Sequence, residues 1–157
     1  MQIAENLVVT PDAPDRHLTR EQIAVELQAH GLKPTTQRVR IAEMLLSAPV
    51  HMTADQILAA LRRSGERISK ATVYNTLKSL AQHRLVRQIH LDPQRCVYDS
   101  TRAPHHHFHD TETGELMDIA PGDIEFSRFP RLPEGMEAEA VDVVIRLRRR
   151  REANSGD

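Results

Sequence analysis

Residues 69–99 read SKATVYNTLKSLAQHRLVRQIHLDPQRCVYD, a helical pattern followed directly by a hairpin pattern. Ser69 is a favourable N-cap, and the apolar residues after it share one helix face: Val73, Leu77 and Leu80. The period then changes to alternation, and a turn at 92–95 separates expected strands at 85–91 and 96–99. Helices closed by such a hairpin are typical of a winged helix-turn-helix, whose last helix enters the major groove of DNA.

Three more helices are expected before this stretch. Thr19 and Thr53 each open a capping box, in which the threonine hydroxyl and a glutamine three residues later satisfy free amides of the first turn. Another helix begins at Thr35 or Thr36, after Pro34. The expected ends of the three helices are Gly31, Pro49 and Gly65.

The outer face of the last helix carries polar side chains suited to DNA. Lysines suit phosphates or guanine, and Asn75 can pair with adenine. An ordinary solvated amphipathic helix would look the same, but the hairpin behind it and the charge of the segment favour DNA. The residues expected to contact DNA are Arg38, Ser69, Lys70, Thr72, Tyr74, Asn75, Lys78 and Arg87.

Charge is segregated along the chain. Residues 31–95 hold 11 basic and 4 acidic side chains, a net charge of +7, whereas residues 1–30 have −3 and residues 96–157 have −5. The whole chain has a net charge of −1. The basic middle suits a polyanion, and the acidic, histidine-bearing end suits a cation.

Four histidines lie within residues 105–109. On a strand, His105, His107 and His109 would share one face, and His106 and Phe108 the other. Imidazole binds Fe, Zn, Mn and haem iron, and nearby carboxylates add oxygen ligands. A polar surface strand is the alternative. The acids near the run are Asp99, Asp110 and Asp118.

The C-terminal part is expected to be β-rich, with further strands at 115–119 and 140–147 and a loop over 120–135. Three strands are too few to stand alone, so they are expected to complete a sheet across a dimer interface. The predicted fold class is α+β, an N-terminal winged helix-turn-helix followed by a small β-rich dimerisation domain. The expected boundaries are a flexible leader at 1–18, the DNA-binding domain at 19–100, the sensing and dimerisation domain at 101–150, and a disordered tail at 151–157.

Several protein classes are disfavoured. The 157 residues contain no apolar run long enough for a membrane span and no secretory signal pattern, which favours the cytoplasm. The single cysteine, Cys96, excludes an internal disulfide and a zinc site with several thiolates. No base–nucleophile pairing and no His-Glu-x-x-His helix is visible, so an enzyme is not expected; a His/Asp metal enzyme is a remote alternative. A metal-buffering protein would leave the basic middle unexplained.

The chain resembles the Fur superfamily of bacterial metal-responsive repressors, and within it the iron response regulators (Irr) of alphaproteobacteria. The superfamily resemblance rests on GLKPTTQR (31–38), HMTADQI (51–57), ATVYNTL (71–77), YD (98–99) and HHH (105–107). The Irr resemblance rests on HHHF (105–108), ELMDI (115–119), PEGM (133–136) and VVIRLR (143–148).

This resemblance implies a homodimeric, haem- and iron-responsive regulator of iron-uptake and haem-biosynthesis genes, with a DNA operator as partner. It implies a haem site at His105, His106 and His107. It also implies a regulatory site for Fe, Mn or Zn at His51, Asp99, His105, His107 and Asp118. The structural four-cysteine zinc of most members is expected to be absent. The alternative is a plain Fe/Mn/Zn-responsive or peroxide-responsive repressor without haem.

Overall fold

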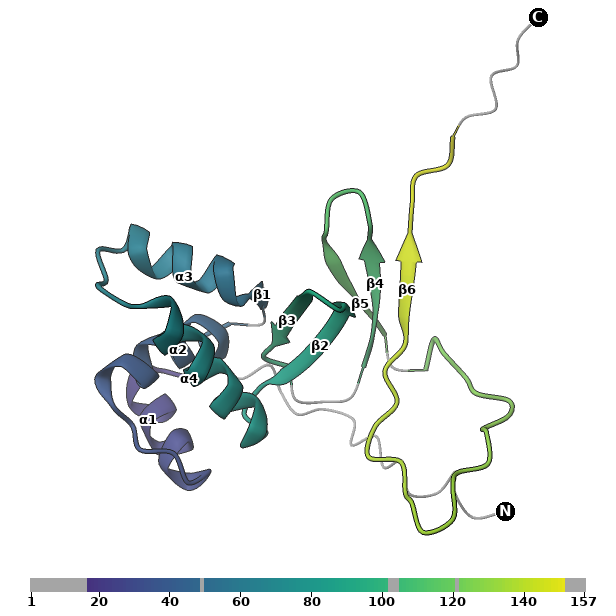
Figure 1. The fold of residues 1–157 in the computed structure, drawn as a ribbon, viewed down its shortest axis with the longest axis horizontal. Coiled ribbons are helices and arrows are strands. Elements are labelled where there is room, and N and C mark those ends of the chain that lie inside the picture. Colours follow the sequence, from purple (N-terminus) through teal and green to yellow (C-terminus); the bar gives the residue numbers. More distant parts are fainter. Residues whose placement is uncertain (1–16, 49, 102–104, 121, 152–157) are drawn as a thin grey trace, which may run out of the picture. The chain divides into compact units, whose positions relative to one another are not determined.

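The computed structural model describes residues 17–48, 50–101, 105–120 and 122–151. The chain divides into two compact units, residues 1–103 and 104–157 (Figure 1). Most of the expected leader and tail, and Pro49 at the expected end of the second helix, lie outside the described residues. The expected domain boundaries remain predictions. No described helix is both long and apolar enough to cross a membrane.

The first unit holds all the described helices: α1 (Arg20–Ala29), α2 (Thr36–Leu46), α3 (Ala54–Arg63) and α4 (Lys70–Gln82). Both expected capping boxes form, at Thr19 and Thr53, and Thr35 and Ser69 cap the other two helices. The helices pack their apolar faces into one core. Its fully buried members include Ile23, Leu27, Ile41, Leu45, Ile57, Leu61, Val73, Leu77 and Leu80.

Three of these helices end in the same way. The amide two residues beyond the C-cap bonds back to a carbonyl of the last turn, which satisfies acceptors that the helix leaves free. These bonds are Leu32 N to Leu27 O (2.8 Å), Glu66 N to Leu61 O (3.1 Å) and Leu85 N to Leu80 O (2.9 Å). The motif needs a left-handed residue in between, which is Gly31 or Gly65 in two cases but Arg84, at φ 58°, after α4.

The first unit also contains a small antiparallel sheet of order β1-β3-β2. Its strands are β1 (His51–Thr53), β2 (Arg87–Asp92) and β3 (Arg95–Asp99). The hairpin of β2 and β3 confirms the expected wing, although β2 begins two residues later than expected. The strand β1 was not predicted, because three residues show no alternation.

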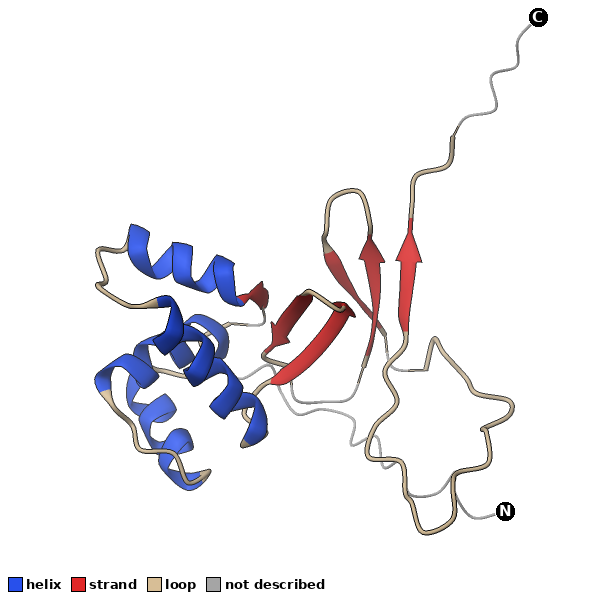
Figure 2. Cartoon of the chain, viewed as in Figure 1, coloured by secondary structure: helices blue, strands red, loops and turns tan. Residues whose placement is uncertain are grey.

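The described residues of the second unit form strands and loops and no helix (Figure 2). These are β4 (His106–Asp110), β5 (Leu116–Ile119) and β6 (Val144–Leu147), in the order β5-β4-β6. β5 pairs antiparallel with β4, whereas β6 pairs parallel. The strand expected over 140–147 forms only in its last four residues. The expected pleat is confirmed, since His105, His107 and His109 are buried and His106 and Phe108 are half-buried.

Candidate metal centre and DNA-binding face

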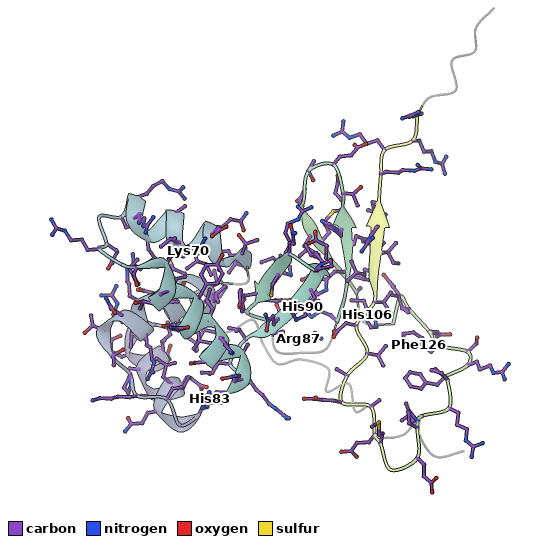
Figure 3. The ribbon with its side chains drawn as sticks, in the orientation of Figure 1. Lys70, His83, Arg87, His90, His106 and Phe126 are labelled. Atoms are coloured by element: carbon purple, nitrogen blue, oxygen red, sulfur yellow. The ribbon has the colours of Figure 1, made fainter. Side chains whose placement is uncertain are left out.

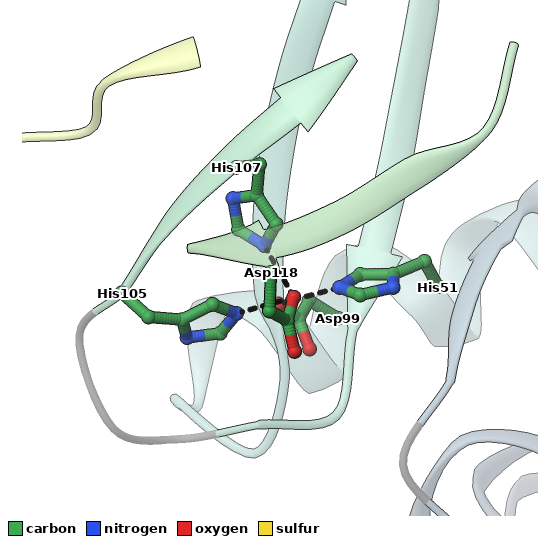
Figure 4. A group of neighbouring side chains, drawn as sticks. All are labelled: His51, Asp99, His105, His107 and Asp118. Atoms are coloured by element: carbon green, nitrogen blue, oxygen red, sulfur yellow. Dashed lines mark ion pairs between the residues drawn. The ribbon is translucent and has the colours of Figure 1, made fainter. Parts of the chain in front are cut away.

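The first unit brings one histidine and one carboxylate together. His51 begins β1 and Asp99 ends β3, and the antiparallel register sets these two residues directly opposite each other. Their Nε2 and Oδ2 atoms are 3.2 Å apart (Figure 4). Asp99 is fully buried, and its Oδ1 accepts the Thr101 amide at 2.8 Å. A buried carboxylate is costly unless it is paired, so a cation bound beside Asp99 would offset this cost.

The second unit brings together two histidines and one carboxylate. His107 and Asp118 are opposed across β4 and β5, and His105 precedes β4 on the same face. The Asp118 Oδ1 atom lies 3.1 Å from Nε2 of His105 and 3.4 Å from Nε2 of His107 (Figure 4). The two imidazole rings are 4.4 Å apart at their centroids. Both histidines are buried, while the side chain of Asp118 is half-exposed.

Within each unit, these distances suit ligands of a divalent cation. Nitrogen and oxygen ligands lie about 2.0–2.2 Å from a divalent metal such as zinc, so neighbouring ligand atoms are about 3.0–3.6 Å apart. Each nitrogen–oxygen separation within the two units falls in this range. The donor chemistry of each unit therefore fits a divalent cation.

His106 lies on the opposite face of β4 from His105 and His107. Its Nδ1 atom accepts a hydrogen bond from the Val143 amide at 3.1 Å. The Phe126 ring packs edge-on against the His106 ring, with 6.0 Å between the ring centroids (Figure 3). A neutral imidazole that accepts at Nδ1 carries its proton on Nε2, so this bond opposes metal binding through Nε2. The expectation that His105, His106 and His107 form one haem site is therefore at odds with the pleat, because the three rings do not share a side of the sheet.

Two other polar residues of β4 are separate from the ligand set. His109 is buried, and neither ring nitrogen has a hydrogen-bond partner among the described residues. Its cross-strand neighbours are Leu116 and Arg146, so no carboxylate stands beside it as Asp118 stands beside His107. Asp110 caps the following turn, where hydrogen bonds from the Glu112 and Thr113 amides lower its pKa.

The candidate DNA contacts differ in how they are held. Ser69 and Thr72 form the cap of α4, whose Thr72 amide donates to the Ser69 hydroxyl at 3.1 Å. Arg38 donates to the Lys33 carbonyl at 3.1 Å. Arg87 is half-buried, with its Nη1 atom enclosed, which makes it less accessible to a phosphate than expected.

Tyr74 and Lys70 lie on the outer face of α4 and share an unexpected neighbour. The Tyr74 hydroxyl donates to Oδ1 of Asp55 at 2.9 Å. Asp55 belongs to the first turn of α3, 19 residues earlier in the chain. Nothing in its local sequence signals this contact, which depends on the packing of α3 against α4.

Comparison with known proteins gives the family. The model of the ferric uptake regulator family matches residues 29–146. This chain belongs to the ferric uptake regulator (Fur) family.

Its relatives include both iron and peroxide regulators. The chain is 33% identical over 129 residues to the ferric uptake regulation protein of Pseudomonas aeruginosa, covering 80% of this chain and 96% of that protein. It is 32% identical over 118 residues to the peroxide-responsive repressor PerR of Staphylococcus aureus, covering 75% of this chain and 74% of the repressor. The structure of the P. aeruginosa regulator with manganese matches with a TM-score of 0.63 at 29% identity, covering 81% of this chain and 97% of that one.

Membership of the Fur family confirms the predicted fold class, a winged helix-turn-helix followed by a small β-rich domain. It also makes the chain a transcriptional regulator, as its Fur and PerR relatives are. These relatives support the metal- or peroxide-responsive alternative better than the haem-responsive reading. The resemblance to iron response regulators stays a prediction.

Proposed function

We propose that this protein is a dimeric, metal-responsive transcriptional regulator whose affinity for operator DNA is set by a divalent cation. The cation would be held by all five predicted ligands: His51, Asp99, His105, His107 and Asp118. The observation that carries this proposal is the pairing of imidazole nitrogens with carboxylate oxygens at 3.1–3.4 Å within each unit, including one carboxylate that is fully buried.

Chain length allows one cation to use ligands from both units. Asp99 ends the wing and His105 precedes β4, six positions further along the chain. Six extended residues span at most about 20 Å, which tethers the two ligand sets. A cation that binds both sets would limit the orientations of the DNA-binding unit, and this limitation would change DNA affinity.

The donor set indicates which cations would bind. Three imidazole nitrogens and two carboxylate oxygens suit Fe(II), Mn(II) or Zn(II), and the absence of a thiolate disfavours Cu(I). The two carboxylates balance the charge of a divalent ion. The manganese in the related P. aeruginosa structure supports the same choice.

DNA would be bound mainly by the outer face of α4. This helix would enter the major groove, one copy from each subunit, with Lys70, Tyr74, Asn75 and Lys78 facing the bases and phosphates. Ser69 and Thr72 would hold the start of the helix in place, and Arg38 would contact phosphate. The net charge of +7 over residues 31–95 supports this assignment.

Haem sensing is the second candidate. The observation that favours it is the aromatic ring of Phe126 beside His106, on the face of β4 opposite the metal ligands. Haem at His106 would require the imidazole to give up its hydrogen bond from Val143. A peroxide response, the third variant, would use iron held by the same five ligands.

Selection from a randomised duplex pool tests the function. The full-length protein would be equilibrated with the pool in chelator, in Mn(II), in Fe(II) and in haem, and the bound DNA sequenced. We expect a single enriched motif with Mn(II) or Fe(II), lost in chelator and in the His107→Ala variant. The matched control is His90→Ala, which removes an exposed histidine of the wing.

Each other outcome has a distinct meaning. Enrichment that needs haem and survives His107→Ala would establish the haem reading instead. If hydrogen peroxide releases the Fe(II)-loaded protein from DNA but not the Mn(II)-loaded protein, the protein is a peroxide-responsive regulator. Enrichment that is equal in chelator and in every cation would refute metal control.

A further inference from the structure

Asp55, Tyr74 and Lys70 form a closed group at the DNA-binding face, here called the Asp55 cluster. Oδ1 of Asp55 accepts the Tyr74 hydroxyl at 2.9 Å and lies 3.9 Å from the Lys70 ammonium. The same ammonium lies 5.4 Å from the centroid of the Tyr74 ring. Each side chain of the cluster therefore contacts the other two.

The cluster is solvent-accessible, and its acid lies at a helix N-terminus. Tyr74 is 40% exposed, and the side chains of Lys70 and Asp55 are exposed further. Asp55 stands in the first turn of α3, where the helix dipole favours a negative charge. The hydrogen bond to Asp55 is the main cause that raises the pKa of Tyr74, so the phenol keeps its proton at neutral pH.

We propose that Asp55 is a specificity-determining residue, because its carboxylate fixes the hydroxyl proton of Tyr74 and thereby decides which bases this side chain accepts. The proposal rests on the proposed function, in which the outer face of α4 meets DNA. Asp55 itself need not touch a base. It acts through Tyr74 and is a positioning residue.

The single proton of a phenol determines which bases Tyr74 can accept. A tyrosine hydroxyl has one proton, and once that proton is donated to Asp55 only oxygen lone pairs face outward. In the major groove, donors are the amino groups of adenine and cytosine, whereas guanine and thymine present carbonyl acceptors. Tyr74 therefore selects adenine or cytosine on the strand it faces and disfavours guanine or thymine.

The charge of Asp55 has a second, separate effect. A carboxylate at the DNA-binding face repels phosphates and offsets part of the attraction of Lys70. Binding to arbitrary DNA is weakened, while a site that offers an amino group to Tyr74 is still accepted. Because this repulsion acts on every sequence alike, discrimination between sites comes from the Tyr74 contact.

Three substitutions separate the two effects. Asp55→Ala removes both the acceptor and the charge, whereas Asp55→Asn removes the charge but keeps an oxygen that can accept the Tyr74 proton. Tyr74→Phe removes the hydroxyl. The control is Glu21→Ala, which removes an exposed acid from the first turn of α1.

The experiment is sequencing of DNA bound by the full-length, Mn(II)-loaded proteins from a randomised duplex pool. For the wild type, we expect one motif position with at least about a fivefold preference for adenine or cytosine over guanine or thymine. Asp55→Ala and Tyr74→Phe should lose that preference at that position alone, while Asp55→Asn and Glu21→Ala keep it. Both Asp55 variants should bind a scrambled duplex several-fold more tightly than the wild type.

A spectroscopic titration reads the contact without DNA. The chain has two tyrosines, and burial raises the pKa of Tyr98 to about 12, which leaves the phenolate absorbance of Tyr74 distinct. Both Asp55 variants should lower the pKa of Tyr74, and Glu21→Ala should leave it unchanged. If Asp55 does not hold the Tyr74 hydroxyl, this titration stays unaltered; the base preference then separates a positioning role from a merely structural one.

The proposal is overturned if Asp55→Ala keeps the base preference of the wild type, or if Asp55→Asn loses it as completely as Tyr74→Phe. It is also overturned if the Tyr74 titration is the same in all variants. A wild-type protein that enriches no motif would instead refute the proposed function itself. A motif that is intact but lacks any Tyr74-dependent position would refute only this inference.

Discussion

Replacing Asp99 with asparagine tests the proposed metal centre at its most buried candidate ligand. The substitution is nearly isosteric, and the asparagine oxygen can still accept the Thr101 amide that Asp99 accepts at 2.8 Å. The carboxylate charge that faces Nε2 of His51 is replaced by a neutral amide group. We therefore expect the metal-free variant to unfold within about 1 kcal/mol of the metal-free wild type.

The cation-bound proteins should differ far more. A cation at 100 times its dissociation constant stabilises the wild type by about 2.7 kcal/mol. Changes to residues behind metal ligands already weaken binding by about 10- to 100-fold, so loss of a charged ligand should weaken it by at least about 100-fold. The same cation concentration then stabilises the variant by only about 0.4 kcal/mol. The difference of roughly 2.3 kcal/mol corresponds to about 5–9 °C in melting temperature for a chain of this size.

Differential scanning calorimetry in chelator and in Mn(II) or Zn(II) measures this difference directly. The matched control is Asp92→Asn, which changes another aspartate of the same hairpin, one that accepts turn amides from Gln94 and Arg95. The control should keep the full cation-induced shift. If Asp99→Asn is stabilised by the cation as strongly as the wild type, Asp99 is no ligand and the five-residue centre is wrong.

Three further predictions concern the first unit. Leu77→Ala, at a fully buried position of α4, should lower the free energy of unfolding by about 2–5 kcal/mol in urea denaturation, and a loss below about 1 kcal/mol would show that α4 is not packed as described. Arg84→Gly should stabilise the protein by up to about 1 kcal/mol, because glycine adopts the left-handed conformation after α4 more readily than arginine does; a destabilised variant in the same denaturation assay would contradict this. Burial opposes ionisation of Glu43, but hydrogen bonds from Arg20 and Arg40 lower the pKa of its carboxyl below the ordinary value of 4.5. The ionised carboxylate therefore stabilises the folded protein fully above pH 4.5, and this stabilisation is lost as the pH falls through the lowered pKa. Glu43→Gln should accordingly cost at most about 1 kcal/mol at pH 7, and its melting curve should converge with that of the wild type on acidification; a gap that stays the same as the pH is lowered would refute the ion-pair account.

The helices of the first unit could be predicted because their start and stop signals are local. Thr19 and Thr53 are followed by the glutamines that complete their capping boxes, and both boxes form as predicted. The end of α4 carries no such signal. Arg84 takes the left-handed conformation there only because the surrounding bonds hold it.

Features that depend on distant pairing were harder to predict. The short strand β1 exists because His51–Thr53 pairs with β3, nearly 50 residues away. The parallel direction of β6 has no signature in its four residues. The alternation of His105–His109 did predict which rings share a face, but not that Val143 would hold His106.

The candidate metal ligands came from family resemblance rather than from spacing. His51 on its own is an ordinary histidine before a helix, and only its register opposite Asp99 shows the two side chains in contact. The contact between Asp55 and Tyr74 had neither a motif nor a resemblance behind it. It arises where two helices meet, and side-chain chemistry alone does not indicate which helices meet.

The pairing of β6 with β4 bears on the order in which the protein folds during synthesis. The helices of the first unit are joined by short connections, and the hairpin of β2 and β3 closes locally, so the helices and the wing form from local contacts and only the three-residue β1 has a distant partner. β4 and β5 likewise form a local hairpin, but β6 must close a loop of more than 30 residues before its register with His107 and Phe108 is made. Such closure is slow relative to helix formation. A ribosome-bound chain would therefore complete its helical unit well before Val143 reaches His106, and the sheet that carries His105, His107 and Asp118 would be the last part to mature.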